Sequence, residues 1–354
     1  MRYGMFFILP ILFFRIALGD QLFPYAVIGA GPAGIITVAK LIEQGVPEKS
    51  IVWIDPEFSV GSLGKYYSTV PSNLKARRYT FFLTSCDLFK AMCFPSFERI
   101  FHYDQNQEPP LQLIVDPLQD ITNYLKERVV SRQAMVSELK CADQTWHIMA
   151  DGLTICAEKV VLASGSHPKR LGYEGFDEIP LDVALDERYL KQVLTQQDKV
   201  IVIGSLHSAL LVLKYVSEIP VRQAVNFYTK QPTYGPYGGL EGITAYWTRE
   251  VLDQQKATNV IRLLYDPRAI EQYKDKGYKI IYAIGYEPNL ISINGSTLID
   301  FDPDTGKIYD NLYGIGIAFA ERYTKEDGVV ISLIGVNSFM QRAKKIVPEL
   351  LGCA

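Results

Sequence analysis

Three glycines near the start of the chain have the spacing with the clearest chemical meaning. Residues 25–34 read Tyr-Ala-Val-Ile-Gly-Ala-Gly-Pro-Ala-Gly, an apolar strand followed by a G-x-G-x-x-G turn. Gly29 permits the tight turn, Gly31 lets the backbone approach a pyrophosphate, and Gly34 allows close packing of helix on strand. A second apolar strand ends at Asp55, whose carboxylate can accept hydrogen bonds from ribose hydroxyls. We predict a βαβ unit that binds a dinucleotide.

The helix after this turn is expected to supply the anion-binding end of the site. Residues 33–44 have helical apolar spacing and stop at Gly45. Pro32 falls in the first helical turn, where its missing N–H would be unpaired in any case. Free N–H groups and the positive end of the helix dipole would then face a phosphate. The predicted contacts of this turn are Gly29, Ala30, Gly31, Pro32, Ala33 and Gly34.

Composition limits the class of protein. The chain has 354 residues, of which 48% are hydrophobic and 21% charged, and its net charge is −3. These values suit two packed α/β domains better than one. No run of lysine and arginine exceeds two residues, so we expect a small-molecule substrate and no nucleic-acid partner. The five cysteines are odd in number and irregularly spaced, which favours neither a disulfide framework nor a metal site.

The N-terminus has the pattern of a secretory signal. Residues 5–14 are an unbroken apolar run after Arg2, and a small-x-small pattern, Ala-Leu-Gly, precedes Asp20. This run is too short to cross a bilayer alone. We therefore expect residues 1–19 to be a signal peptide, the mature protein to be exported, and no stable membrane span to remain. An uncleaved membrane anchor and a wrongly assigned start codon are the alternatives.

A second nucleotide-binding unit follows a linker. Residues 199–203 are an apolar strand that leads into Gly-Ser-Leu-His-Ser-Ala and a helix. Leu206 occupies the place of the second glycine, and Ala209 replaces the third, which is a tolerated change. Lys230 follows the next strand and could pair with a 2′-phosphate, favouring NADPH; a solvated strand-end lysine is the alternative. The predicted contacts are Gly204, Ser205, Ser208 and Lys230.

Five segments together resemble the pyridine nucleotide-disulfide oxidoreductase superfamily and its flavin-containing monooxygenase-like branch. They are residues 27–34, 160–168, 200–209, 281–289 and 312–318, and they occur in the order found in that superfamily. The resemblance implies that the first turn binds the ADP part of FAD. It also implies that Gly165 marks a crossing between domains and that Gly316 lies near the ribityl-pyrophosphate.

The implied fold is α/β, with two Rossmann-like domains, FAD-binding and NAD(P)-binding, the smaller inserted into the larger. The predicted boundaries are 20–168 for the first part of the FAD-binding domain, 169–279 for the inserted NAD(P)-binding-like domain, and 280–354 for the second part of the FAD-binding domain.

The chain departs from the disulfide reductases of this superfamily. It contains no C-x-x-C pair anywhere, so a dithiol relay is not expected. The monooxygenase branch fits better, because its members carry a serine-asparagine step near the flavin that Ser72-Asn73 resembles. This resemblance implies that the Asn73 amide lies at the reactive edge of the flavin and hydrogen-bonds to oxygen activated there. A turn residue after Pro71 is the alternative.

We therefore predict an FAD-dependent oxidoreductase, with an NADPH-dependent monooxygenase acting on a small molecule as the leading hypothesis. The alternatives are a flavin-dependent reductase without oxygenation and a non-catalytic FAD-binding secreted protein. The tyrosine-rich residues 228–247 are a candidate lid or substrate wall, or else an aromatic packed loop. The substrate and the oligomeric state do not follow from the sequence.

Overall fold

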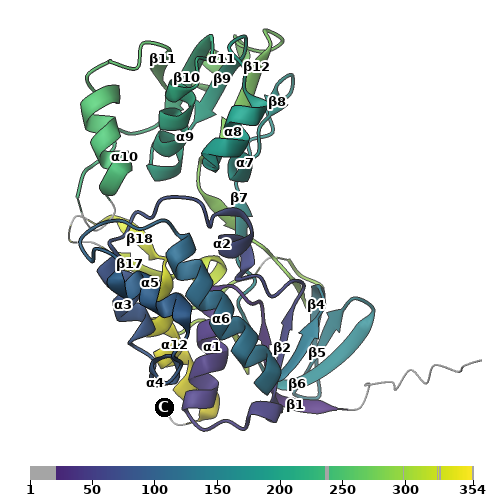
Figure 1. The fold of residues 1–354 in the computed structure, drawn as a ribbon. Coiled ribbons are helices and arrows are strands. Elements are labelled where there is room, and N and C mark those ends of the chain that lie inside the picture. The colour runs from purple at the N-terminus through teal and green to yellow at the C-terminus, as the bar shows by residue number, and fades with distance from the viewer. Residues whose placement is uncertain (1–20, 236–238, 298, 325, 327, 353–354) are drawn as a thin grey trace, which may run out of the picture.

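The computed structural model describes residues 21–235, 239–297, 299–324, 326 and 328–352, in two domains placed one above the other in Figure 1. The predicted signal, residues 1–19, lies outside the described residues. No helix in the described part of the chain is long and apolar enough to cross a membrane.

The first domain is built on a nine-stranded sheet with parallel strands at its centre. Strand β1 runs parallel between β2 and β6, and β3 extends the sheet beyond β2. Strands β4, β5 and β6 form an antiparallel meander. The strands are β1 (Leu22–Ile28), β2 (Ile51–Asp55), β3 (Val130–Gln133), β4 (Val136–Ala142), β5 (Thr145–Ala150), β6 (Leu153–Leu162), β14 (Ser292–Ile293), β15 (Lys307–Tyr309) and β16 (Leu312–Gly314).

Helices cover one face of this sheet. Apolar residues of α1, α6 and α12 form one buried cluster with the inward side chains of β1 and β2, and Figure 1 shows these helices on the side of the sheet away from the β4–β6 meander. A group of short helices lies between β2 and α6 in the chain. The helices are α1 (Pro32–Glu43), η1 (Glu48–Ser50), α2 (Gly61–Tyr66), α3 (Ala76–Leu83), α4 (Asp87–Lys90), α5 (Pro95–His102), α6 (Gln112–Arg128), η3 (Ile317–Phe319) and α12 (Val336–Leu351).

The second domain has a five-stranded parallel sheet in the order β11-β10-β9-β12-β8. Its two faces carry separate buried clusters, one of which includes most of α9. The strands are β8 (Asp177–Glu178), β9 (Lys199–Ile203), β10 (Gln223–Tyr228), β11 (Val260–Leu264) and β12 (Tyr278–Tyr282). The helices are α7 (Leu181–Leu185), α8 (Glu187–Val193), α9 (His207–Glu218), α10 (Gly242–Trp247), the π-helical turn η2 (Thr248–Leu252) and α11 (Pro267–Glu271).

The position of β12 corrects one predicted domain boundary. This strand pairs in parallel with both β9 and β8, so a boundary at residues 279 and 280 would cut through a central strand of the second domain. The chain returns to the first sheet only at β14, which pairs with β4. Sequence reasoning misplaced the boundary because an apolar strand does not reveal which sheet it joins.

A two-stranded connector joins the domains. Strand β7 (Ser166–Pro168) pairs antiparallel with β13 (Tyr286–Pro288). The imidazole of His167 lies 2.7 Å from Asn289 Oδ1 and 3.0 Å from Glu287 Oε1. The two crossings of the chain are therefore tied to each other by backbone and side-chain hydrogen bonds.

A loop of the first domain also packs against the second domain. Val70 is buried in the same cluster as α9, and Thr69 Oγ1 donates a 2.9 Å hydrogen bond to Asp186 Oδ2, at the N-terminus of α8. The ring of Tyr67 meets that of Tyr286 edge-to-face, with centroids 6.1 Å apart. This loop leads directly to Ser72 and Asn73.

Candidate active site

The first glycine turn leaves open space above Gly31. A Cβ atom added there would have no neighbour within 4 Å, whereas one at Gly29 would lie 2.2 Å from Ala163 O and one at Gly34 would lie 1.9 Å from Gly29 O. Helix α1 begins after Gly31, with Pro32 in its first turn and no side chain capping its amides. The turn therefore presents uncapped N–H groups beside an unfilled cradle, which fits a pyrophosphate.

Two other glycines close around this turn. Gly61 has a φ of +58°, and a Cβ there would lie 3.0 Å from Gly31 Cα. Gly316 has a φ of +93°, and a Cβ there would lie 3.0 Å from Ala33 Cβ. Residues from three distant parts of the chain, including the predicted Gly316, therefore meet at the N-terminus of α1.

Asp55 holds this turn in place through its backbone contacts. Its Oδ2 accepts a 2.7 Å hydrogen bond from Ala30 N, and its Oδ1 accepts hydrogen bonds from Glu57 N and Phe58 N at 2.8 and 2.6 Å. Trp53 Nε1 adds a 2.9 Å hydrogen bond to Gly29 O. The sequence placed Asp55 at the end of its strand, but its role as a tie between the glycine turn and the next loop was missed.

The Ser72-Asn73 step divides its two side chains between different environments. Ser72 is 2% exposed, and its hydroxyl lies 2.6 Å from the hydroxyl of Tyr79; burial raises the pKa of Tyr79 to about 12. Asn73 is exposed, and within the described residues its amide has no hydrogen-bond partner. The hydroxyl of Ser72 therefore has a structural hydrogen-bonding role, whereas the amide of Asn73 is available to bind a ligand.

Two loops pair across this step. Pro71 and Pro110 form an isolated antiparallel bridge, Ser72 N donates to Pro109 O at 2.9 Å, and Leu111 N donates to Val70 O at 3.0 Å. Asn73 follows two residues after Pro71, in a bend where Leu74 N donates a 2.8 Å hydrogen bond to Ser72 Oγ, and Glu108 precedes Pro110 by two residues.

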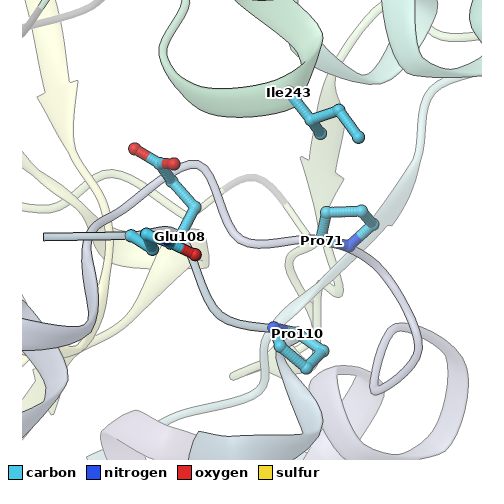
Figure 2. Close-up of a pocket in the computed structure, with 5 residues that line it drawn as sticks. Pro71, Glu108, Pro110 and Ile243 are labelled. Carbon is cyan, nitrogen blue, oxygen red and sulfur yellow. The ribbon is translucent and has the colours of Figure 1, made fainter. Parts of the chain in front are cut away.

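A cavity of about 360 Å³ lies beside the Pro71–Pro110 bridge, between the two domains. It is lined by Pro71, Gln107, Glu108 and Pro110 from the first domain and by Ile243 from α10 of the second domain, as Figure 2 shows. Ile243 belongs to the tyrosine-rich stretch that the sequence marked as a candidate substrate wall. The cavity is therefore completed by both domains, and Asn73, two residues after Pro71, is not among the residues that line it.

The second glycine turn is tied, through the side chain of Ser205, to the residues that follow β10. Gly204 has a φ of +148°, and a Cβ there would lie 2.3 Å from Ala283 O. Ser205 Oγ accepts hydrogen bonds from Thr229 N and Lys230 N at 2.8 and 3.4 Å. Lys230 is exposed, so the structure brings the predicted Ser205 and Lys230 together with the ammonium group directed to the surface.

The N-terminus of α9 adds little charge to this second site. Leu206 stands at the N-cap position with its side chain 44% exposed, and no side chain caps the helix. Burial lowers the pKa of His207 to about 4, so its imidazole is neutral at physiological pH. Ser208, one residue further along, is half-buried. A phosphate here would rely on the helix dipole and on cations from other strands.

Arg262 on β11 is such a cation, and sequence reasoning missed it. Its Nε donates to Asn226 Oδ1 and its Nη1 to Gln231 Oε1, each at 3.2 Å. Its guanidinium lies 4.3 Å from the ring centroid of Tyr228, while its Nη2 is buried without a hydrogen-bond partner in the described residues. Asn226 Nδ2 in turn donates to Gly204 O at 3.0 Å. Arg262 is thereby linked to the second glycine turn.

The predicted Gly165 lies at the domain connector. Its φ is +71°, and its carbonyl accepts a 3.0 Å hydrogen bond from Asn289 N. Ser164 Oγ donates to Asn289 O at 2.8 Å. This arrangement fixes the crossing between domains. Among the described residues, no group of three metal-binding side chains is present.

Comparison with known proteins identifies the family. Residues 23–218 match the pyridine nucleotide-disulphide oxidoreductase family, so the chain belongs to it. The chain is 24% identical over 381 residues to monooxygenase AgnR1 of Paecilomyces divaricatus, covering 92% of this chain and 97% of that protein.

Two solved structures share the fold. The bacillithiol disulfide reductase Bdr of Staphylococcus aureus superposes with a TM-score of 0.62 at 12% identity, covering 94% of this chain and 99% of that one. The OTEMO complex with FAD and NADP gives a TM-score of 0.56 at 12% identity, covering 94% and 98%.

These comparisons confirm the predicted superfamily, the oxidoreductase class that its name gives and the fold of two dinucleotide-binding domains. The cradle above Gly31 and the uncapped start of α1 fit the pyrophosphate of FAD.

Proposed function

We propose that this protein is an NADPH-dependent flavin monooxygenase that oxidises a small molecule in the cavity between its domains. Family membership and the similarity to a monooxygenase over nearly the whole chain support this proposal. The observation that carries it is the exposed, unbonded amide of Asn73, two residues along the chain from Pro71, which lines the interdomain cavity. The sequence contains no C-x-x-C pair, which argues against the disulfide reductase alternative.

The first domain would hold FAD at the glycine turn. The first-turn amides of α1 would bind the pyrophosphate, with Gly31 allowing its approach and Gly61 and Gly316 closing around it. When bound, the flavin supplies hydride acceptance from the nicotinamide and activation of oxygen. The protein supplies position and exclusion of bulk water.

The second domain would hold NADPH. The exposed Lys230 and the half-buried Arg262 both lie near the end of β10, where a dinucleotide fold places the adenosine ribose. A planar guanidinium with an unpartnered Nη2 suits a 2′-phosphate better than a lone ammonium does. We infer that Arg262, more than Lys230, sets the preference for NADPH over NADH.

Asn73 is the residue that we assign to the oxygen chemistry. Its amide can donate to activated oxygen and also accept from a neighbouring N–H group, which an alanine cannot do. The paired loops hold its backbone rigidly, since Ser72 N and Leu111 N are hydrogen-bonded on either side of the bridge. A preorganised donor of this kind favours transfer of oxygen to substrate over loss of peroxide.

The proposal is tested by comparing wild type with Asn73→Ala under NADPH and oxygen. We expect the variant to keep its flavin and its rate of reduction by NADPH while releasing more peroxide per NADPH consumed. Peroxide release that is complete in wild type and unchanged in the variant would contradict the monooxygenase assignment.

A reductase or non-catalytic flavoprotein is the second candidate, and one observation favours it. Leu206 replaces the glycine that lets a pyrophosphate approach α9, and the neutral His207 brings no compensating charge. Reduction by NADPH would then be slow. Anaerobic titration with NADPH distinguishes the candidates, because a non-catalytic protein would keep its oxidised flavin spectrum.

We also propose that the protein is exported after cleavage of residues 1–19, as the N-terminal sequence pattern indicates.

A further inference from the structure

We propose that the interdomain cavity is the substrate site and that Glu108 is its recognition residue. Glu108 would accept a hydrogen bond from a donor group, an ammonium or a hydroxyl, on an otherwise apolar molecule, and would disfavour anionic molecules. This inference rests on the proposed function, because it names the class of substrate that the same site would take.

Three of the residues that line the cavity, Pro71, Pro110 and Ile243, are apolar, and Gln107 and Glu108 are polar. Pro71 and Pro110 are fixed by the backbone bridge between them, and Ile243 faces them from the second domain, as Figure 2 shows. Neither proline has an N–H group to offer a ligand. At about 360 Å³ the cavity is within the usual range for small-molecule sites. These walls would select an apolar body of one or two rings.

Glu108 is the charged residue among those that line the cavity. It is half-buried, and within the described residues its carboxylate has neither a hydrogen bond nor an ion-pair partner. A carboxylate partly withdrawn from water gains from a donor and is penalised by a second negative charge. The vacant acceptor on an apolar wall therefore points to a donor-bearing ligand.

The position of Glu108 would also orient the ligand. Glu108 precedes Pro110 by two residues and Asn73 follows Pro71 by two residues, so both flank the bridge that joins the two loops. A molecule anchored through its donor group at Glu108 would lie beside the amide that we assign to oxygen chemistry. Recognition and reaction would then depend on two residues brought together by the pairing of the two loops.

A structural role is the competing explanation. The Glu108 side chain reaches toward α10, where a Cβ added to Gly242 would lie 2.9 Å from Glu108 Cγ and 3.1 Å from its Oε2. Glu108 could therefore serve only to hold the two domains together. Glu241, the N-cap residue of α10, does not line the cavity. It provides a matched control, because Glu241→Gln removes the same charge next to Gly242, at the N-terminus of α10.

The experiment measures binding to the oxidised holoprotein without turnover. The probes are 2-phenylethylamine, 2-phenylethanol and 3-phenylpropanoate, which share one ring and differ in charge. Binding is followed by calorimetry and by perturbation of the flavin spectrum. We expect the amine, the alcohol or both to bind at least tenfold more tightly than the anion, since a hydrogen bond to a charged group is worth about 10- to 100-fold. Which of them binds more tightly distinguishes a cationic ligand from a neutral donor.

The variants decide the role of Glu108. Glu108→Gln should reduce the preference for the amine or the alcohol over the anion by at least tenfold. Glu241→Gln should keep the wild-type preference. Ile243→Trp, at a half-exposed position, should fill the cavity from the other domain and weaken the better-binding probes even if Glu108→Gln fails to fold.

Three results would overturn the inference: no binding of any probe, an anion that binds as tightly as the other two, or equal effects of Glu108→Gln and Glu241→Gln. Because no probe needs to react, a failed oxygenation assay would leave this test unaffected.

Discussion

Replacing Gly31 by valine should separate flavin binding from folding. A Cβ at this position meets no protein atom within 4 Å, and the backbone φ of −73° is open to any residue. Loss of glycine at an N-cap position costs about 1 kcal/mol. The melting temperature of the flavin-free protein should therefore fall by only about 2 °C.

The same side chain would occupy the space proposed for the pyrophosphate. Losing two hydrogen bonds to a charged group, at about 1.5–3 kcal/mol each, weakens binding by about 3–6 kcal/mol. The Kd for FAD should then rise by roughly 100- to 10,000-fold. Flavin titration of the apoprotein, followed by fluorescence quenching, measures this change.

Gly34→Val is the matched control within the same motif. A Cβ there would lie 1.9 Å from Gly29 O, so this substitution should prevent correct folding whether or not flavin is present. If the Kd of Gly31→Val for FAD is within about threefold of the wild-type value, or if this variant unfolds as Gly34→Val does, the space above Gly31 is not the pyrophosphate site.

Three further predictions concern the electron donor, pH and export. Arg262→Met should lower the preference for NADP⁺ over NAD⁺ by about tenfold or more in equilibrium binding, and Lys230→Met should lower it by less. If Arg262→Met weakens the binding of both nucleotides equally, Arg262 does not set the preference. The side-chain hydrogen bond from Arg188 lowers the pKa of Asp186 to about 2 from its usual 3.8, so the ionised carboxylate stabilises the fold above pH about 4 and this contribution disappears as the pH falls toward 2. Asp186→Asn should therefore reduce the melting temperature at pH 7, with a difference that shrinks below pH about 4; a difference that is constant with pH would reject this. N-terminal sequencing of secreted protein should begin at or near Asp20, and an intact N-terminus on an intracellular protein would contradict export.

The local motifs of this fold were readable from the sequence because their chemistry depends on short spacings. The glycine turn, the apolar strand before it and the helix after it all lie within residues 22–43, and the structure forms them there. Both dinucleotide-binding folds were predicted in this way. The position of Asp55 at the end of its strand was also predicted. Its contacts with the N–H groups of Glu57 and Phe58 were not, because they depend on the conformation of the loop that follows the strand.

The missed features depend on pairings between distant segments. Arg262 reaches the second glycine turn because β11 pairs with β10, at Asn226 opposite Arg262, and β11 was not predicted. Glu108 lines a cavity together with Pro71 only because two irregular loops form the Pro71–Pro110 bridge. Neither segment has a periodic apolar pattern that would indicate the contact.

The most direct test of the monooxygenase assignment is the fraction of consumed NADPH that appears as peroxide, measured with wild type and Asn73→Ala under identical conditions. We expect both proteins to bind flavin and to be reduced by NADPH at similar rates. Peroxide release should be low in wild type when substrate is bound and at least tenfold faster in the variant, because one preorganised donor is lost. Equal peroxide yields, with normal flavin content in both, would contradict the role of Asn73 and favour a reductase.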